Sequence, residues 1–214
     1  MKVAVIDYGV GNLGSVMRSL EELRVTPMLI KNPNDMSSAD SFILPGVGNF
    51  ADCANILEKN GWKESINNQV ISQEKPILGI CLGMQLLASI GMEGSEGLNP
   101  NGTEGLSLIP GCVKSLRELG CNLSVPHVGW NEIKCYSKNE SLFDNIPDGT
   151  DFYFVHSYVF VPDSNEHIIA VTDYGISVVA AVRKDHIWGT QFHPEKSSKA
   201  GFRLLKNFIE NPIC

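Results

Sequence analysis

Residues 76–91 of the chain read PILGICLGMQLLASIG. The apolar run Ile77 to Ile80 after the proline predicts a strand that is buried on both faces of a sheet. Apolar residues then recur at positions 82, 86, 87 and 90, which predicts a core-facing helix over residues 82–90 that ends at Gly91. Cys81 lies at the junction, with Gly79 and Gly83 on either side. A buried strand that passes directly into a helix is the building unit of a parallel α/β sheet.

The sequence before this junction repeats the same alternation. Strands are expected over residues 2–7, 27–30 and 41–44, and helices over residues 13–23, 51–60 and 63–73, with a break at Gly61-Trp62. Strands that alternate with helices favour a doubly wound, mostly parallel sheet with helices on both faces. The N-terminal half is therefore predicted to be an α/β layer structure.

The sequence after residue 91 has a different texture. Residues 91–105 are rich in Gly, Asn, Ser and Glu and predict a long loop. Short strands are then expected over residues 111–116, 125–133, 152–161, 167–172, 177–182 and 187–193, with hairpin turns at Tyr174-Gly175 and Lys184-Asp185. A helix over residues 198–210 ends the pattern. We expect one α/β domain over residues 1–214, with an antiparallel β extension in its C-terminal half.

Composition narrows the class of protein. The 17 Lys and Arg against 24 Asp and Glu give a net charge of −7, so we expect no basic surface that follows a phosphate backbone and no nucleic-acid partner. No run approaches the roughly 20 apolar residues of a membrane span. The six cysteines form no Cys-x-x-Cys pair. We therefore expect a cytoplasmic protein with reduced thiols and no metal site.

The segment Gly9-Val10-Gly11-Asn12-Leu13-Gly14 matches the G-x-G-x-x-G pattern of dinucleotide-binding loops. Such folds place an acidic residue at the end of the second strand to hold the ribose, and here Lys31 stands there. We interpret the glycines as a tight strand-to-helix turn and expect no cofactor. A dinucleotide-binding module stays open as a competing class, and saturable binding of NAD or NADP would support it.

Gly79-Ile80-Cys81-Leu82-Gly83 is a thiol version of the nucleophile elbow, in which small flanking residues let the chain turn sharply and expose the central side chain. The positive end of the following helix favours a thiolate, and the Leu82 amide is free to stabilise an oxyanion. Most free cysteines are simply small buried apolar residues, so the elbow needs a base nearby to carry catalysis.

That base is predicted at the end of the last strand, in Gln191-Phe192-His193-Pro194-Glu195. Residues two apart in an extended segment face the same way, so Glu195 would lie beside His193 and orient its ring. Cys81, His193 and Glu195 would then serve as nucleophile, general acid/base and positioning group. A metal is the competing use of a His-x-Glu pair, but no third ligand accompanies it at a recognisable spacing.

These segments resemble the class I, triad-type glutamine amidotransferases. Five further motifs are similar to the glutaminase subunits of imidazole glycerol phosphate synthases: IDYGVGNL (6–13), LPGVG (44–48), TEGL (103–106), PHVGWN (126–131) and FVHSY (154–158). The resemblance follows the same order along the whole chain. It implies a flavodoxin-like α/β fold and hydrolysis of glutamine by a Cys-His-Glu triad without a cofactor.

The resemblance also implies site residues. Gly46 and Val47 resemble the oxyanion strand, which together with Leu82 would form the oxyanion hole. The expected glutamine-binding residues are Gln85, Glu104, His156, Ser157 and Tyr158, with Glu104 suited to the substrate ammonium group. The implied partner is a (β/α)8-barrel cyclase subunit that forms a heterodimer with the chain, uses the ammonia for histidine biosynthesis, and contacts Asn12, Trp130 and Lys196.

Two departures keep other interpretations open. Ser107 stands where the family usually has glycine, and Val128 where it usually has methionine. Neither change removes a catalytic atom, but both leave room for a paralogue that supplies ammonia for amidation of a surface-polysaccharide sugar. A thiol hydrolase of the DJ-1 or peptidase type on the same sheet is a further alternative, which would need neither the terminal His-Pro-Glu nor a glutamine pocket.

Overall fold

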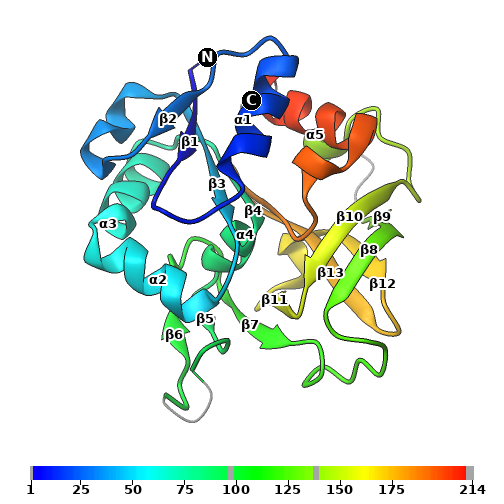
Figure 1. The fold of residues 1–214 in the computed structure, drawn as a ribbon. Coiled ribbons are helices and arrows are strands. Elements are labelled where there is room, and N and C mark those ends of the chain that lie inside the picture. Colours follow the sequence, from blue (N-terminus) through cyan, green and yellow to red (C-terminus); the bar gives the residue numbers. More distant parts are fainter. Residues whose placement is uncertain (1, 96–98, 137–139, 211–214) are drawn as a thin grey trace.

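The computed structural model describes residues 2–95, 99–136 and 140–210. Its centre is an eight-stranded sheet in the order β2-β1-β3-β4-β14-β13-β12-β9 (Figure 1). The strands of this sheet are β1 (Val3–Ile6), β2 (Met28–Ile30), β3 (Ser41–Gly46), β4 (Ile77–Cys81), β9 (Lys134–Cys135), β12 (Ile168–Asp173), β13 (Ser177–Lys184) and β14 (Ile187–Thr190). The α-helices are α1 (Leu13–Glu22), α2 (Phe50–Lys59), α3 (Trp62–Asn67), α4 (Leu82–Leu86) and α5 (Ser198–Glu210).

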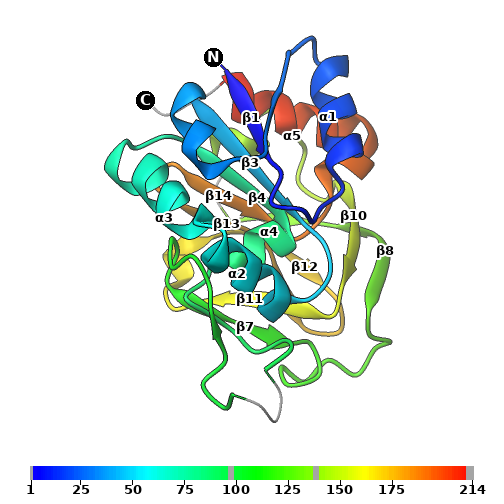
Figure 2. The ribbon, with the colours of Figure 1, turned by 60° about the vertical axis from the view of Figure 1, so that its left-hand side comes forward.

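The five strands from β2 to β14 pair in parallel. This confirms the parallel sheet predicted for the N-terminal half, and β14, which was expected in the antiparallel extension, also pairs in parallel with β4. All residues of β1, β3, β4 and β14 are buried, because helices cover both faces of the sheet. Val3 and Val5 pack with α1 and α5 on one face. Ala4 and Ile6 pack with α2 and α3 on the other (Figure 2). The predicted α/β layers are therefore confirmed.

The antiparallel extension continues the same sheet beyond β14. β13 pairs antiparallel with β14, and β12 with β13, through turns in which Gly175 and Asp185 have φ values of 71° and 53°. Two smaller sheets lie beside it. One pairs β8 (His127–Glu132) with β10 (Asp151–His156), and the other has the order β11 (Tyr158–Pro162), β7 (Gly111–Ser115), β5 (Ile90–Gly91) and β6 (Thr103–Glu104).

The helix predicted over residues 82–90 is shorter in the structure. α4 ends at Leu86, and Ile90 already belongs to β5. The carbonyl groups that follow are bound from elsewhere, since the Leu106 amide donates to Leu86 O at 2.8 Å and the Leu108 amide to Leu87 O at 2.9 Å. Backbone donors from residues 106–108 thus replace the next helical turn. The predicted loop 91–105 contains β6, and its residues 96–98 lie outside the described part.

The strand predicted over residues 152–161 is divided at Ser157. β10 ends at His156 and pairs with β8, whereas β11 begins at Tyr158 and pairs with β7. The chain changes partner at this point, which periodicity along one strand does not reveal. The helix predicted over residues 63–73 likewise passes into a π-helical turn after Asn67. No helix of the described residues is long and apolar enough to span a membrane.

We expect Gly83→Ala to be strongly destabilising. A Cβ atom at Gly83 would lie 1.8 Å from the carbonyl oxygen of Leu44 in β3. Because α4 would have to move off the sheet, the free energy of unfolding should fall by about 3 kcal/mol. Chemical denaturation of the variant measures this loss.

The matched control is Gly14→Ala in α1, where an added Cβ would meet nothing within 4 Å. This change should raise the free energy of unfolding by up to about 1 kcal/mol, since alanine is the better helix former. Equal unfolding free energies for the two variants would contradict the close contact between α4 and β3.

Candidate active site

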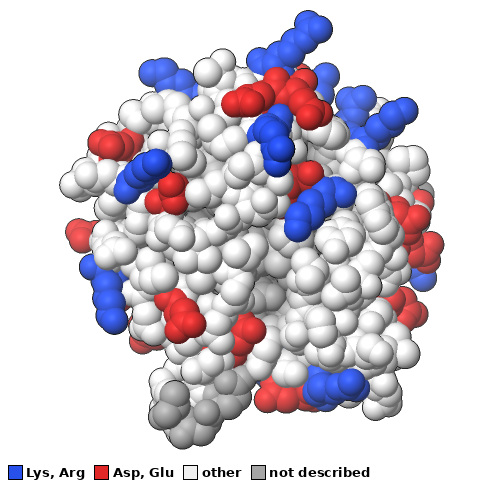
Figure 3. Space-filling model, viewed as in Figure 1, with Lys and Arg blue, Asp and Glu red and all other residues white. Residues whose placement is uncertain are grey.

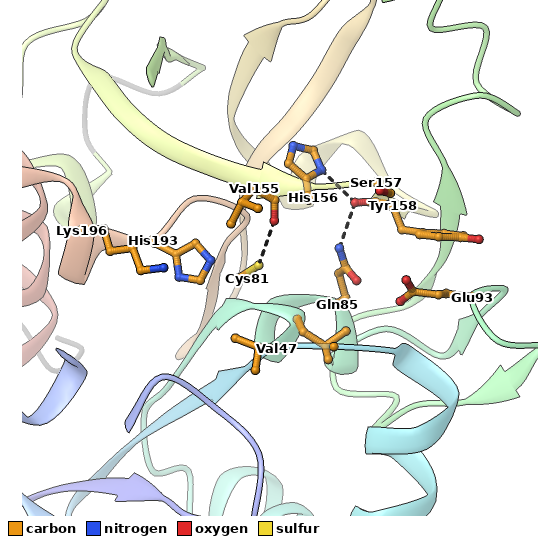
Figure 4. Close-up of a pocket in the computed structure, with 12 residues that line it drawn as sticks. Val47, Cys81, Gln85, Glu93, Val155, His156, Ser157, Tyr158, His193 and Lys196 are labelled. Atoms are coloured by element: carbon orange, nitrogen blue, oxygen red, sulfur yellow. Dashed lines mark hydrogen bonds between the residues drawn. The ribbon is translucent and has the colours of Figure 1, made fainter. Parts of the chain in front are cut away.

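Cys81 occupies a strained turn between β4 and α4. Its φ and ψ are 56° and −110°, a conformation that is rare for a residue with a side chain. The turn is possible because Gly79 and Gly83 lie in contact, so that a Cβ at Gly79 would approach Gly83 O to 2.6 Å. The Cys81 side chain is 7% exposed, and its Sγ lies 3.8 Å from Val155 O (Figure 4). The predicted elbow geometry is present.

His193 and Glu195 form a buried pair. His193 Nδ1 lies 2.8 Å from Glu195 Oε1, and both side chains are at most 2% exposed. The geometry differs from the expected extended strand, because β14 ends at Thr190 and residues 194–196 form a 3-10 turn that carries Glu195 back towards the ring. His193 Nε2 is buried and has no hydrogen-bond partner among the described residues.

Strand order brings this pair to Cys81. β14 is the parallel neighbour of β4, with Thr190 opposite Ile80. The chain segments that follow both strands therefore leave the same edge of the sheet. Figure 4 shows the His193 ring turned towards Cys81.

The surroundings of His193 raise its pKa above the ordinary value of histidine. Burial by itself would lower its pKa, but Cys81 and the Glu195 carboxylate outweigh this effect and raise the pKa to about 9. The thiolate is the nucleophilic form of a cysteine. The arrangement can therefore support attack on a carbonyl carbon and subsequent proton donation to a leaving group.

A cavity of about 250 Å³ opens above the thiol. Its walls come from five parts of the chain, namely the β3–α2 loop, the elbow with α4, the segment after β5, the β10–β11 junction and the segment after β14. The lining residues are Val47, Gly48, Cys81, Leu82, Gln85, Glu93, Val155, His156, Ser157, Tyr158, His193 and Lys196.

Gln85 is a fixed part of the cavity wall rather than an exposed helix residue. Its side chain is 3% exposed, and Nε2 donates to Tyr158 O at 2.9 Å and to Gln191 Oε1 at 3.0 Å. Gln191 Nε2 in turn lies 3.8 Å from Cys81 Sγ. The structure therefore joins Gln85, Tyr158 and the nucleophile in one hydrogen-bonded set. His156 and Ser157 line the same wall.

Glu104 does not lie where it was expected. It sits in β6 with a side chain that is 84% exposed, and it pairs with Lys63 at 3.3 Å, outside the cavity. Glu93 lines the cavity instead, and its Oε2 accepts a hydrogen bond from the Phe50 amide at 2.9 Å. Sequence reasoning missed Glu93, although it follows the predicted elbow helix by only a few residues. The structure thus places the Glu93 carboxylate at the cavity wall and the Glu104 carboxylate outside it.

The expected oxyanion residues surround the elbow. Val47 and Leu82 line the cavity, and Gly46 pairs with Cys81 in the β3–β4 register. A side chain at Gly46 would press on the Gly83 amide nitrogen at 2.8 Å, so this position requires glycine. The Val47 carbonyl accepts a hydrogen bond from the Cys53 thiol at 3.6 Å, which ties the segment to α2.

The three residues expected at a partner interface lie in different surroundings. Trp130 is 53% exposed and packs edge to face with Tyr153, at 6.0 Å between ring centroids. Lys196 Nζ lies 5.7 Å from the centroid of the same Tyr153 ring and also lines the cavity. Asn12 has an internal contact that the sequence did not suggest, since its Nδ2 donates to Glu195 Oε1 at 3.1 Å. The glycine turn therefore supports the His193–Glu195 pair.

Comparison with known proteins assigns the family. The model of the family "Glutamine amidotransferase class-I" matches residues 4–211. A protein of Campylobacter jejuni (strain RM1221) named imidazole glycerol phosphate synthase subunit HisH 1 is 45% identical over 207 residues, which cover 97% of this chain and 98% of that protein. A protein of Moorella thermoacetica named imidazole glycerol phosphate synthase subunit HisH is 43% identical over 208 residues, which cover 97% of this chain and 94% of that protein.

Solved structures share the fold at lower identity. A crystal structure of a glutamine amidotransferase superimposes with a TM-score of 0.73 at 16% identity and covers 98% of both chains. The structure of PurLQS from Thermotoga maritima gives a TM-score of 0.72 at 15% identity, over 97% of both chains. The predicted class I amidotransferase fold is confirmed.

We expect Glu195→Gln to lower the pKa of His193. The ring should hold its second proton up to about pH 9 in the wild-type chain. Removal of the carboxylate removes an interaction that raises the pKa, so the midpoint of the titration should move to lower pH. Nuclear magnetic resonance of the ring protons measures the midpoint. Glu166→Gln, an exposed carboxylate outside the cavity, is the control and should leave it unchanged. An unmoved midpoint in Glu195→Gln would overturn the pairing.

Proposed function

The chain belongs to the class I glutamine amidotransferases, among the imidazole glycerol phosphate synthase subunits HisH, and from that premise we propose that it supplies ammonia from glutamine to a partner subunit in histidine biosynthesis. The observation that carries this proposal is the strained Cys81 elbow facing the buried His193–Glu195 pair, inside a cavity that also presents Gln85 and Glu93.

The reaction begins at the thiolate. Cys81 Sγ attacks the carboxamide carbon of glutamine and forms a tetrahedral intermediate, whose oxyanion accepts hydrogen bonds from the backbone amides of Leu82 and Val47. Collapse of the intermediate breaks the carbon–nitrogen bond, and the His193 imidazolium gives its proton to the leaving nitrogen. Ammonia and a glutamyl thioester result. Neutral His193 then deprotonates a water molecule that hydrolyses the thioester to glutamate.

The supporting residues have defined tasks in this scheme. Glu195 holds the His193 ring through the 2.8 Å contact at Nδ1, which leaves Nε2 directed at the reacting atoms. Gln85, His156, Ser157 and Tyr158 form the wall that holds glutamine. Glu93 is the carboxylate within the cavity and replaces Glu104 as the group that meets the substrate ammonium.

The partner we propose is a (β/α)8-barrel cyclase that forms a heterodimer with this chain. The apolar side chains of Val128 and Trp130 are 55% and 53% exposed on one side of β8, and exposed aromatic residues are typical of interface anchors. Lys196 lies beside Tyr153 near Trp130 and adds a positive charge. Over the face in Figure 3, acidic and basic side chains are interspersed.

The described cysteines are free thiols, which fits a cytoplasmic location.

The alternatives are less well supported. The relatives from Campylobacter jejuni and Moorella thermoacetica are named as imidazole glycerol phosphate synthase subunits, so amidation of a polysaccharide sugar is not favoured. The His193–Glu195 pair and the Gln85 wall are features that a DJ-1-like thiol hydrolase does not require. The turn over Gly9 to Gly14 holds Asn12 in hydrogen-bond contact with Glu195. This structural role explains the glycines of the turn without a bound dinucleotide.

We expect Cys81→Ala to abolish glutamine-dependent product formation by the assembled enzyme, because the nucleophile is lost. The same complex should still use added ammonium salts, since the acceptor site lies on the other chain. Cys135→Ala is the control, because this half-buried thiol lies outside the cavity and should keep full glutamine use. Steady-state assays of the complex with each nitrogen source measure both activities. Glutamine turnover retained by Cys81→Ala would refute the mechanism.

Glu93→Gln and Glu104→Gln form a matched pair that decides which carboxylate binds the substrate. Glutamine at position 93 keeps an acceptor for the Phe50 amide but loses the negative charge, so KM for glutamine should rise about tenfold or more. The Glu104 carboxylate is exposed and pairs at the surface with Lys63, so its loss should change KM less than about twofold. The reverse order would restore Glu104 to the site.

A further inference from the structure

The proposed mechanism leaves a buried histidine unused. His127 is 2% exposed, lies in β8 and pairs with His156 across the β8–β10 ladder. We propose that His127, held by Asn131, is a positioning residue that donates to His156 Nε2, holds the His156 ring against the Tyr158 carbonyl, and thereby sets the orientation of Gln85 in the glutamine pocket. This inference rests on the proposed function, because it concerns how the same pocket is prepared for its substrate.

The direction of each hydrogen bond follows from one carbonyl group. His156 Nδ1 lies 2.9 Å from Tyr158 O, which can only accept, so Nδ1 carries the proton. His156 Nε2 is then an acceptor, and its partner at 3.0 Å, His127 Nδ1, must donate. His127 Nε2 in turn accepts from Asn131 Nδ2 at 3.4 Å. Only one pair of neutral tautomers satisfies this chain of contacts.

Packing holds the His127 ring in place. The ring is stacked between Tyr174 at 3.9 Å and Phe154 at 4.8 Å, measured between centroids. Burial lowers the pKa of His127 to about 4. Burial, with smaller contributions from the neighbouring His127 and His193, lowers the pKa of His156 to about 3. Both rings are therefore neutral in the working range of pH. Asn131 Nδ2 also donates to Asp173 O at 2.8 Å, and this second hydrogen bond holds the Asn131 side chain beside His127.

The series of hydrogen bonds from Asn131 through His127 and His156 ends at Tyr158, in the wall of the glutamine pocket. Tyr158 O accepts from His156 Nδ1 and from Gln85 Nε2, so it is the point at which the two side chains meet (Figure 4). Gln85 donates its two Nε2 protons to Tyr158 O and Gln191 Oε1. Its Oε1 is then left as an acceptor, which suits an N–H group of glutamine and rejects a carbonyl oxygen. His127 acts on the substrate only through these neighbours.

Two substitutions at one position separate hydrogen bonding from packing. His127→Asn keeps an N–H donor near the position of Nδ1, whereas His127→Leu fills the space without a donor. In the complex with its partner subunit, we expect His127→Leu to raise KM for glutamine about tenfold with a much smaller change in kcat. His127→Asn should restore KM to within about threefold of the wild-type value. His167→Asn, in a half-buried histidine outside the cavity, is the control and should change neither constant.

A second measurement does not depend on activity. Nitrogen chemical shifts of His156 should show the Nδ1-protonated tautomer in all three chains, because the Tyr158 carbonyl remains its partner. The Nε2 resonance should move towards that of a nitrogen without a hydrogen bond in His127→Leu, and stay near the wild-type position in His127→Asn. Equal KM values for the Leu and Asn variants, or an unmoved His156 Nε2 resonance in His127→Leu, would overturn the inference. Failure of the proposed function gives a different result, namely a wild-type complex that does not hydrolyse glutamine although its His156 tautomer is the expected one.

Discussion

The close approach of α4 to the ends of β3 and β4 is the constraint on which the site depends. Gly79, Gly83 and Gly46 meet there at distances that exclude any Cβ atom. Without that contact the chain could not reverse within one residue, and Cys81 would not be held in its strained conformation above the sheet. The elbow is therefore stabilised by backbone packing rather than by interactions of the cysteine side chain itself.

The remainder of the site is assembled by topology. β14 lies beside β4, so the segment after it delivers His193 to the same edge, and the 3-10 turn adds Glu195. The β10–β11 junction supplies the opposite wall, because the chain changes sheet at Ser157 and turns the Tyr158 carbonyl towards Gln85. Five separate segments thus meet at one cavity, and each is held by a neighbouring strand or helix.

Short-range sequence patterns predicted those features of the fold and the site that depend on residues close together in the chain. The alternation of strand and helix and the bounds of α5 follow from periodicity within short windows. The pairing of His193 with Glu195 is present as predicted, but a 3-10 turn brings the two side chains together rather than the extended segment that the prediction assumed. The misplaced Glu104 and the overlong helix after Cys81 share one physical cause, since both depend on how residues 103–109 fold back on α4. The contacts of Asn12 with Glu195 and of His127 with His156 join residues that are 183 and 29 positions apart, and no local pattern encodes them.

The two faces of β8 carry side chains with different surroundings, and this limits which mutations the strand can accept. His127 and Asn131 point inward, whereas Val128 and Trp130 point outward and are exposed. Because side chains alternate along a strand, inserting or deleting one residue within β8 would turn the residues beyond the change to the opposite face and disrupt both faces together. Point substitutions can adjust either face alone, but length variation at this strand cannot. Insertions are therefore to be sought in the loops that flank β8, where they leave its register untouched.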